Sequence, residues 1–244
     1  MRRATLALLS FAAIAAAGNS FSLGETGERT AGQVVLLHGL GRTNRSMDLL
    51  AAALDAADYA VCNIDYPSRD YPIDELVNNH VVPAIHACGF DVRGAVDFVT
   101  HSLGGIIVRE ISASSALPNI GRVVMLAPPN QGSEIVDLLG DNWLFEFING
   151  PAGQQLGTEA ESKPNSLGAA EFELGIITGN SSINPLLSNI IPGEDDGTVA
   201  VQRAKVAGME DFLILPVSHP FIMRDEVVIR QSLHFLAHGE FDHN

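Results

Sequence analysis

The sequence predicts an α/β domain in which helices cover both faces of a mostly parallel sheet of six strands, or slightly more. Short runs of valine, leucine and isoleucine alternate along the chain with stretches of helical periodicity. These runs are apolar at nearly every position, which is typical of strands that are buried on both faces. The chain has 244 residues, of which 46% are hydrophobic, so one domain can bury a full core.

The N-terminal segment has the pattern of a secretory signal. A charged start, Met1-Arg2-Arg3, precedes an apolar stretch at 4–17 that ends in small residues suited to cleavage. This stretch is shorter than the about 20 residues that a membrane-spanning helix needs. We therefore expect residues 1–20 to be a cleaved signal peptide, and residues 30–244 to be the domain of a secreted or periplasmic protein. The alternatives are an uncleaved anchor or a buried helix.

The first elements follow in order after this segment. An apolar run at 33–37 is expected to be a central strand, and it leads into a tight glycine turn at 38–41. Asn44 is placed to cap a helix at 45–57, whose apolar residues share one face. A second strand is expected at 60–64.

The next stretch contains a loop and an imperfect helix. Prolines indicate a loop at 65–72, where Tyr66 and Tyr71 either line the mouth of a site or pack against the domain. A helix is expected at 73–87, although Pro83 should bend or interrupt it.

The stretch at 97–105 carries the strongest functional signal. Its apolar run ends at Thr100 and a helical pattern follows the glycines, so Ser102 falls in a sharp turn between strand and helix. Gly104 and Gly105 would let the helix pass close to the strand. A serine in such a turn is exposed beside backbone N–H groups that can receive an oxyanion, which favours a nucleophile. The alternative is a serine that only caps the helix.

The C-terminal half continues the alternation less regularly. Strands are expected at 122–126, 173–178 and 212–215, and a last helix is expected from Arg224 to about residue 237. Regular patterns fade between 130 and about 170, apart from a short helix that can open at 132–134.

The five residues from Thr100 to Gly104 resemble the nucleophile elbow G-x-S-x-G of the α/β-hydrolase superfamily, with threonine in place of the first glycine. The resemblance implies the α/β-hydrolase fold, and the chain is similar to small secreted bacterial lipases and esterases. It also implies that the backbone N–H groups of Leu40 and Leu103 form an oxyanion hole. Because the segment 130–170 is short, the resemblance implies a small or absent cap.

Members of this family carry an acid and a base after the nucleophile, in the order Ser, Asp or Glu, His. The loop Asp196-Gly197-Thr198-Val199 resembles the acid loop of bacterial lipases, and His219 follows the last predicted strand as the family's base does. The resemblance therefore implies Ser102 as nucleophile, His219 as base and Asp196 as acid. Asp195 competes for the acid role, but the spacing within the loop favours Asp196.

The reaction implied by this set is hydrolysis of carboxylic esters through an acyl-enzyme, on a small-molecule or lipid ester and with transient contact to a lipid surface. No cofactor is expected. The same three residues also suit an acyltransferase or a thioesterase, and a non-catalytic hydrolase-like binding protein is the alternative from another class. Substrate-binding residues and the oligomeric state are not predicted by the sequence.

The net charge of −15, with 14 Lys and Arg against 29 Asp and Glu, argues against a nucleic-acid partner. Acidic residues at 194–196 resemble part of a calcium site, and His234 and His238 have a spacing that can face one zinc ion. Neither set has enough ligands, so no metal site is expected.

The sequence does not determine whether its two cysteines form a disulfide. In an exported chain Cys62 and Cys88 can pair, which would add about 3 kcal/mol of stability. Their apolar flanks are equally compatible with two separate buried thiols.

Overall fold

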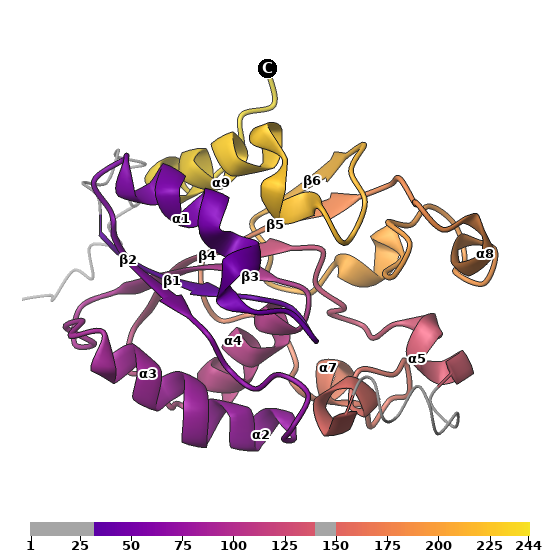
Figure 1. Ribbon diagram of the computed structural model, residues 1–244, viewed down its shortest axis with the longest axis horizontal. Helices are drawn as coiled ribbons and strands as arrows, with labels where there is room; N and C mark the ends of the chain where they lie inside the picture. Colours follow the sequence, from indigo (N-terminus) through magenta and orange to yellow (C-terminus); the bar gives the residue numbers. More distant parts are fainter. Residues whose placement is uncertain (1–31, 140–149) are drawn as a thin grey trace, which may run out of the picture.

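The computed structural model describes residues 32–139 and 150–244. In this part of the chain six strands form one parallel sheet in the order β2-β1-β3-β4-β5-β6 (Figure 1). The predicted fold class is therefore confirmed, and every pair of neighbouring strands is parallel. The predicted signal peptide and residues 140–149 of the predicted cap segment lie outside the described residues. The strands are β1 Gln33–Leu37, β2 Ala60–Ile64, β3 Val96–His101, β4 Ile120–Leu126, β5 Leu174–Gly179 and β6 Asp211–Leu215.

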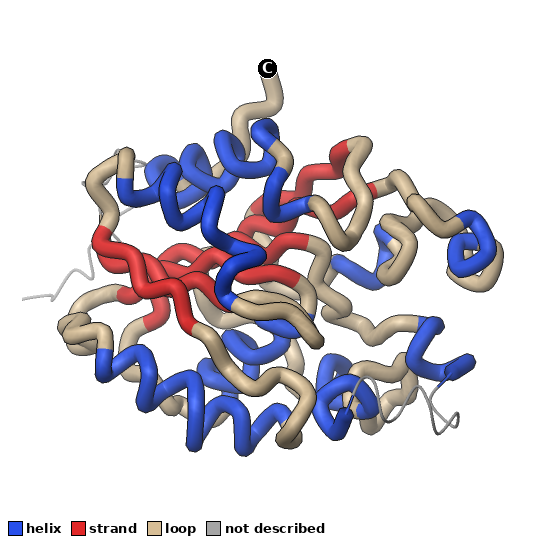
Figure 2. The backbone as a smooth tube through the Cα atoms, in the orientation of Figure 1, coloured by secondary structure: helices blue, strands red, loops and turns tan. Residues whose placement is uncertain are grey.

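Helices cover both faces of this sheet, with α1 and α9 on one face and α2, α3 and α4 on the other (Figures 1 and 2). The helices α5, α7 and α8 lie beside the sheet (Figure 1). None of the helices in the described ranges has the length and hydropathy of a membrane span. The helices are α1 Asp48–Asp55, α2 Ile73–Glu75, α3 Val82–Ala87, α4 Leu103–Ala113, α5 Glu134–Leu139, α7 Lys163–Ser166, α8 Pro185–Ser188 and α9 Glu226–His238.

The central strands are apolar on both sides because both sides face a helix layer. In β1, Val35 and Leu37 join the core cluster that includes the residues of α4, while Val34 and Leu36 join the cluster that includes α1 and α9. All four side chains are fully buried. Burial of one such side chain stabilises the fold by about 1.5 to 3 kcal/mol, so these runs define the strands more strongly than local propensity does.

Helix starts differ from the prediction in two places. The helix expected at 45–57 begins as a 3-10 turn, Asn44–Met47, and Thr43 holds the cap position without a side-chain hydrogen bond. Asn44 is therefore not the cap. The last helix starts two residues later than expected because Asp225 caps it, accepting hydrogen bonds from the N–H groups of Val227 and Val228.

The predicted interruption at Pro83 takes the form of a wider helical segment. Between α2 and α3, residues Leu76–Val81 form π-helical turns. Proline has no N–H to donate, and its ring crowds the carbonyl four residues earlier. A locally widened helix accommodates the proline, so the helical segment continues from α2 into α3.

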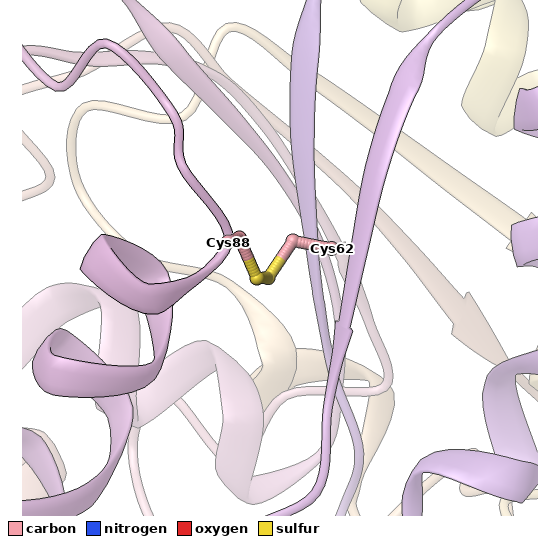
Figure 3. Close-up of a disulfide and its surroundings, with 2 residues drawn as sticks. All are labelled: Cys62 and Cys88. Atoms are coloured by element: carbon pink, nitrogen blue, oxygen red, sulfur yellow. A yellow bond between two sulfur atoms is a disulfide. The ribbon is translucent and has the colours of Figure 1, made fainter.

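The two cysteines form a disulfide between Cys62 on β2 and Cys88 after α3, with their Cα atoms 6.1 Å apart (Figure 3). Of the two alternatives, pairing is the correct one. The bond ties the helix layer to β2, which is an edge strand of the sheet and has a neighbour on one side only.

The register of the sheet determines which loops can meet. Leu37 at the end of β1 lies opposite Thr100 near the end of β3, and Gly179 at the end of β5 lies opposite Leu215 at the end of β6. Because the strands are parallel, the turns after β1 and β3 and the loops after β5 and β6 all emerge at one edge.

Candidate active site

Ser102 occupies the turn between β3 and α4 in a strained backbone conformation, with φ 52° and ψ −119°. Such a conformation is rare for a residue other than glycine and persists only where neighbours hold it. Here the Ser102 N–H donates to the carbonyl of Leu126 at 2.9 Å, and the Gly105 N–H donates to the Ser102 carbonyl at 3.0 Å. The side chain is 8% exposed. The predicted sharp turn is thus present, and the sheet holds it in place.

Gly104 is required where α4 begins. A Cβ atom at this position would lie 2.6 Å from the carbonyl oxygen of Leu37, a distance that real Cβ contacts do not reach. The helix therefore passes close to β1, whereas the prediction placed the close approach at the strand that ends at Thr100. Thr100, which stands in place of the first glycine of the motif, is fully buried within β3.

His219, Asp196 and Ser102 meet in one hydrogen-bonded chain. His219 Nε2 lies 3.1 Å from Ser102 Oγ, and His219 Nδ1 lies 2.8 Å from Asp196 Oδ2. Since a carboxylate can only accept, Nδ1 carries the proton and Nε2 is free to accept the serine proton. This is the tautomer that can activate a serine hydroxyl.

The loop that carries Asp196 fixes the carboxylate in one orientation. Its Oδ1 accepts hydrogen bonds from the N–H groups of Thr198 at 3.0 Å and Val199 at 2.8 Å, which leaves Oδ2 for His219. Its backbone carbonyl accepts the His219 N–H at 2.9 Å. The spacing from Asp196 to Val199 thus has a structural reason, and the side chain is fully buried.

Asp195 points to a different set of groups. Its Oδ1 accepts hydrogen bonds from Ser188 Oγ and from the Gly197 N–H, both at 2.7 Å. Asp195 therefore connects its loop to α8, while Asp196 contacts the histidine.

Gly179 was not identified from the sequence, although it lets the two later loops converge. A Cβ atom at this position would lie 2.1 Å from the carbonyl oxygen of Val217 and 3.0 Å from Asp196 Cβ. A glycine within a strand often marks such a close approach, but the predicted strand ended at residue 178, one residue before Gly179.

The predicted oxyanion turn packs directly against Ser102. A Cβ atom at Gly39 would lie 2.7 Å from His101 Nδ1 and 3.2 Å from Ser102 Cβ, so the turn that contains Leu40 is in contact with the elbow. Leu103 is the first residue of α4, and its N–H therefore has no acceptor within the helix. Both residues thus lie beside the serine, as an oxyanion hole requires.

His38 and Tyr66 stabilise this turn through ring stacking and hydrogen bonds. The rings are stacked with centroids 4.2 Å apart, and the Tyr66 hydroxyl donates to the His38 carbonyl at 2.6 Å. His38 Nδ1 lies 2.9 Å from the Gly39 carbonyl, and burial lowers the pKa of His38. Tyr66 therefore packs in the interior, whereas Tyr71 is partly exposed and contacts the His80 ring.

His101 contacts the histidine of the site, which the sequence did not reveal. Its Nε2–H donates to the His219 carbonyl at 3.1 Å, and the two ring centroids are 4.9 Å apart. Burial above all, together with the proximity of His219 and Arg42, holds the pKa of His101 well below its usual value. A neutral His101 thus helps to position the loop of His219.

A cavity of about 370 Å³ opens beside Ser102 and His219. Most of its lining side chains are apolar, and many come from α5, α8 and the loops beside them. Part of the predicted cap segment therefore forms one wall. The apolar lining residues are Leu40, Pro129, Ile135, Val136, Leu156, Ile183, Leu187, Val199 and Pro220.

The two metal alternatives receive no support from the geometry. Asp195 and Asp196 point to different partners, and the His234 and His238 rings pack against each other with centroids 4.4 Å apart. Within residues 32–139 and 150–244, His, Cys, Asp and Glu side chains form no group of three that could hold a metal ion.

Comparison with known proteins agrees with this architecture. The sequence profile of the alpha/beta hydrolase family matches residues 34–211. No curated protein sequence matches. Among solved structures, the mature lipase BlEst2 of Bacillus licheniformis is similar at 19% identity and a TM-score of 0.61, covering 86% of this chain and 94% of the lipase.

Two further structures resemble the chain at similar identity. A metagenomic carboxyl esterase matches at 20% identity and a TM-score of 0.57, over 80% of this chain and 67% of the esterase. Phospholipase PlaB of Legionella pneumophila matches at 20% identity and a TM-score of 0.55, over 72% of this chain and 46% of the phospholipase. At these identities the likeness concerns the fold.

Proposed function

Because the chain belongs to the alpha/beta hydrolase family, we propose that it is a serine hydrolase that cleaves carboxylic esters through Ser102, His219 and Asp196. The observation that carries the proposal is the hydrogen-bonded chain from Asp196 through His219 to Ser102, at 2.8 and 3.1 Å. It coincides with a strained serine turn at the wall of a cavity.

In the proposed reaction, the Ser102 oxygen attacks the ester carbonyl while His219 takes the hydroxyl proton. Asp196 holds the imidazole in the required tautomer and stabilises its protonated form. The N–H groups of Leu40 and Leu103 receive the negative charge that develops on the carbonyl oxygen. The imidazolium then gives its proton to the departing alcohol, and water releases the acid from the acyl-enzyme in a second round.

The cavity supports a substrate with an apolar acyl chain. Its surface is mostly apolar, and about 370 Å³ is within the range of pockets that enclose small ligands. Three similar structures are described as a lipase, a carboxyl esterase and a phospholipase, which is consistent with an ester substrate.

We also propose that the protein is exported and makes transient contact with lipid surfaces. The charged and apolar pattern of residues 1–20 supports removal of a signal peptide on export. Beside the cavity, Ile183 is 65% exposed and Leu186 on α8 is 77% exposed. Apolar side chains that project at the entrance of an ester-binding cavity suit a substrate presented at an interface.

A panel of nitrophenyl esters from acetate to palmitate tests the proposed function. The purified protein should hydrolyse at least the shorter esters, and Ser102→Ala should lose this activity while keeping its melting temperature. Added alcohol or thiol acceptors then separate hydrolysis from acyl transfer by product analysis. A folded protein that cleaves no member of the panel would instead favour the non-catalytic binding protein.

A further inference from the structure

Arg42 differs in charge from everything else around the cavity. Among the described residues that line it, Arg42 is the one lysine or arginine, and the one acidic residue, Asp196, is already paired with His219. Arg42 itself has no carboxylate partner in the described part of the chain; its recorded hydrogen bond goes to the Pro220 carbonyl at 3.5 Å. In a protein with a net charge of −15, this places an exposed cation, without a directly paired carboxylate among the described residues, at the edge of the cavity.

Arg42 lies on the side of the cavity where the alcohol part of an ester would leave. Pro220 directly follows His219, so the guanidinium lies on the histidine side of Ser102. The departing alcohol must receive its proton from His219, and it therefore leaves on this same side. The acyl chain, in contrast, has the aliphatic side chains of α5 and α8 available to it.

Arg42 also lines a second hollow, of about 380 Å³, formed by the turn after β1 and the loop after β2. This hollow contains both charges and hydroxyls, unlike the apolar cavity. Its polar side chains, besides Arg42, are Thr43, Asp65, Ser68, Arg69 and Asp70. The two hollows share Arg42, so one amphipathic ester can place its acyl chain in the first and its polar end in the second.

From this arrangement, and resting on the proposed ester hydrolysis, we propose that the enzyme prefers esters whose departing alcohol carries a phosphate group, and that Arg42 determines this specificity. A guanidinium carries a positive charge and presents paired donors that match phosphate oxygens. Asp65 and Asp70 in the same hollow favour a headgroup that combines one phosphate charge with an ammonium group.

The test compares two esters with the same acyl chain, octanoylglycerol and octanoyl-glycerophosphocholine, below their micelle concentrations and at fixed ionic strength. The wild-type enzyme should favour the phosphocholine ester in kcat/KM by about tenfold, the size expected of a charge-assisted hydrogen bond at a partly solvated site. In Arg42→Gln this ratio should fall to about one, mainly through KM, and Arg42→Lys should restore part of it.

Arg45 provides the matched control. It is an exposed arginine three residues further along the chain and lines neither hollow. Arg45→Gln should keep the wild-type ratio. Melting curves of all variants show whether the fold is retained.

Each alternative outcome is distinguishable. A wild-type ratio of one, or an unchanged ratio in Arg42→Gln, overturns the proposal while leaving ester hydrolysis intact. Equal losses on both esters in Arg42→Gln would show that Arg42 only supports the loop of His219, and would also overturn it. If the wild-type enzyme cleaves neither these esters nor the nitrophenyl esters, the proposed function itself fails.

Discussion

The two walls of the cavity are held in different ways. On one wall, Ser102, Asp196 and His219 are each less than 10% exposed, and hydrogen bonds fix the polar side-chain atoms of all three. On the other wall, Ile183 lines the cavity and is 65% exposed, and Leu186 on the adjoining α8 is 77% exposed. Bond rearrangement requires atoms at fixed positions, whereas an acyl chain needs only apolar contact. We infer that the reaction type depends on the first wall and the choice of acyl chain on the second.

Substitution of Asp196 should have the largest effect on kcat. It tests whether activity depends on the exact hydrogen bonds of the first wall. Asp196→Asn keeps the size of the side chain but favours the wrong histidine tautomer, and we expect kcat to fall by up to about four orders of magnitude. Asp195→Asn should be far milder, because an amide oxygen can still accept from Ser188 and Gly197.

Both variants are measured on one short-chain nitrophenyl ester, so that the second wall contributes little. If Asp195→Asn loses most activity and Asp196→Asn keeps it, the acid role belongs to Asp195.

The dependence of stability on pH tests whether the first wall holds His101 neutral. Burial places the pKa of His101 below its value in the unfolded chain, about 6.5. Below that pH the unfolded state binds the extra proton, so the free energy of unfolding falls as pH decreases, by up to about 1.4 kcal/mol per pH unit. Above it, this contribution is fully retained.

Denaturant unfolding between about pH 7.5 and about pH 5, on either side of the ordinary histidine pKa, measures this slope. The slope should be smaller in His101→Gln than in the wild type. His86→Gln is the control, since His86 is exposed on α3. An equal slope in the wild type and His101→Gln would show that His101 is not held neutral by burial.

Substitutions on the second wall should have the smallest effect, and only on some substrates. Leu186→Ser removes an exposed apolar side chain without a partner in the core. We expect a decrease of a few-fold, on the order of 1 kcal/mol, on emulsified or micellar esters and no change on soluble acetate esters.

Leu49→Ser serves as the control, because Leu49 is also exposed, at 54%, but lies on α1, which contributes no residue to the cavity, whereas α8 contributes Leu187. Equal losses in both variants, or a loss on soluble esters in Leu186→Ser, would contradict a role of α8 in contact with lipid.

The sequence predicted features that depend on neighbouring residues better than features that depend on distant ones. Strand β1 was predicted at its observed bounds, because burial on both faces requires an unbroken apolar run. The edge strand β2 was also predicted at its observed bounds, although its burial alternates. Asp196 could be distinguished from Asp195 because the Asp-Gly-x-Val spacing lets one carboxylate accept two backbone N–H groups of its own loop. Both features depend on residues that are close together in the chain, so a short sequence pattern is enough to predict them.

Long-range contacts left much weaker signals. The hydrogen bond from His101 to the His219 carbonyl joins residues far apart in the chain, and the glycine at 179 serves two separate loops. The pairing of Cys62 with Cys88 depends on how α3 packs on β2, which apolar flanks alone do not determine. The cavity lining likewise comes from segments that have no shared pattern.

Labelling with a fluorophosphonate tests the central claim, that the strained turn and the histidine make Ser102 a nucleophile. The probe reacts with activated serines, so we expect one adduct, located at Ser102 by mass spectrometry. Ser102→Ala should not be labelled. Ser133→Ala should still be labelled, because Ser133 lines the same cavity but donates its hydroxyl proton to the Thr198 carbonyl. An adduct that persists in folded Ser102→Ala, or that lies on Ser133 in the wild type, would contradict the assignment.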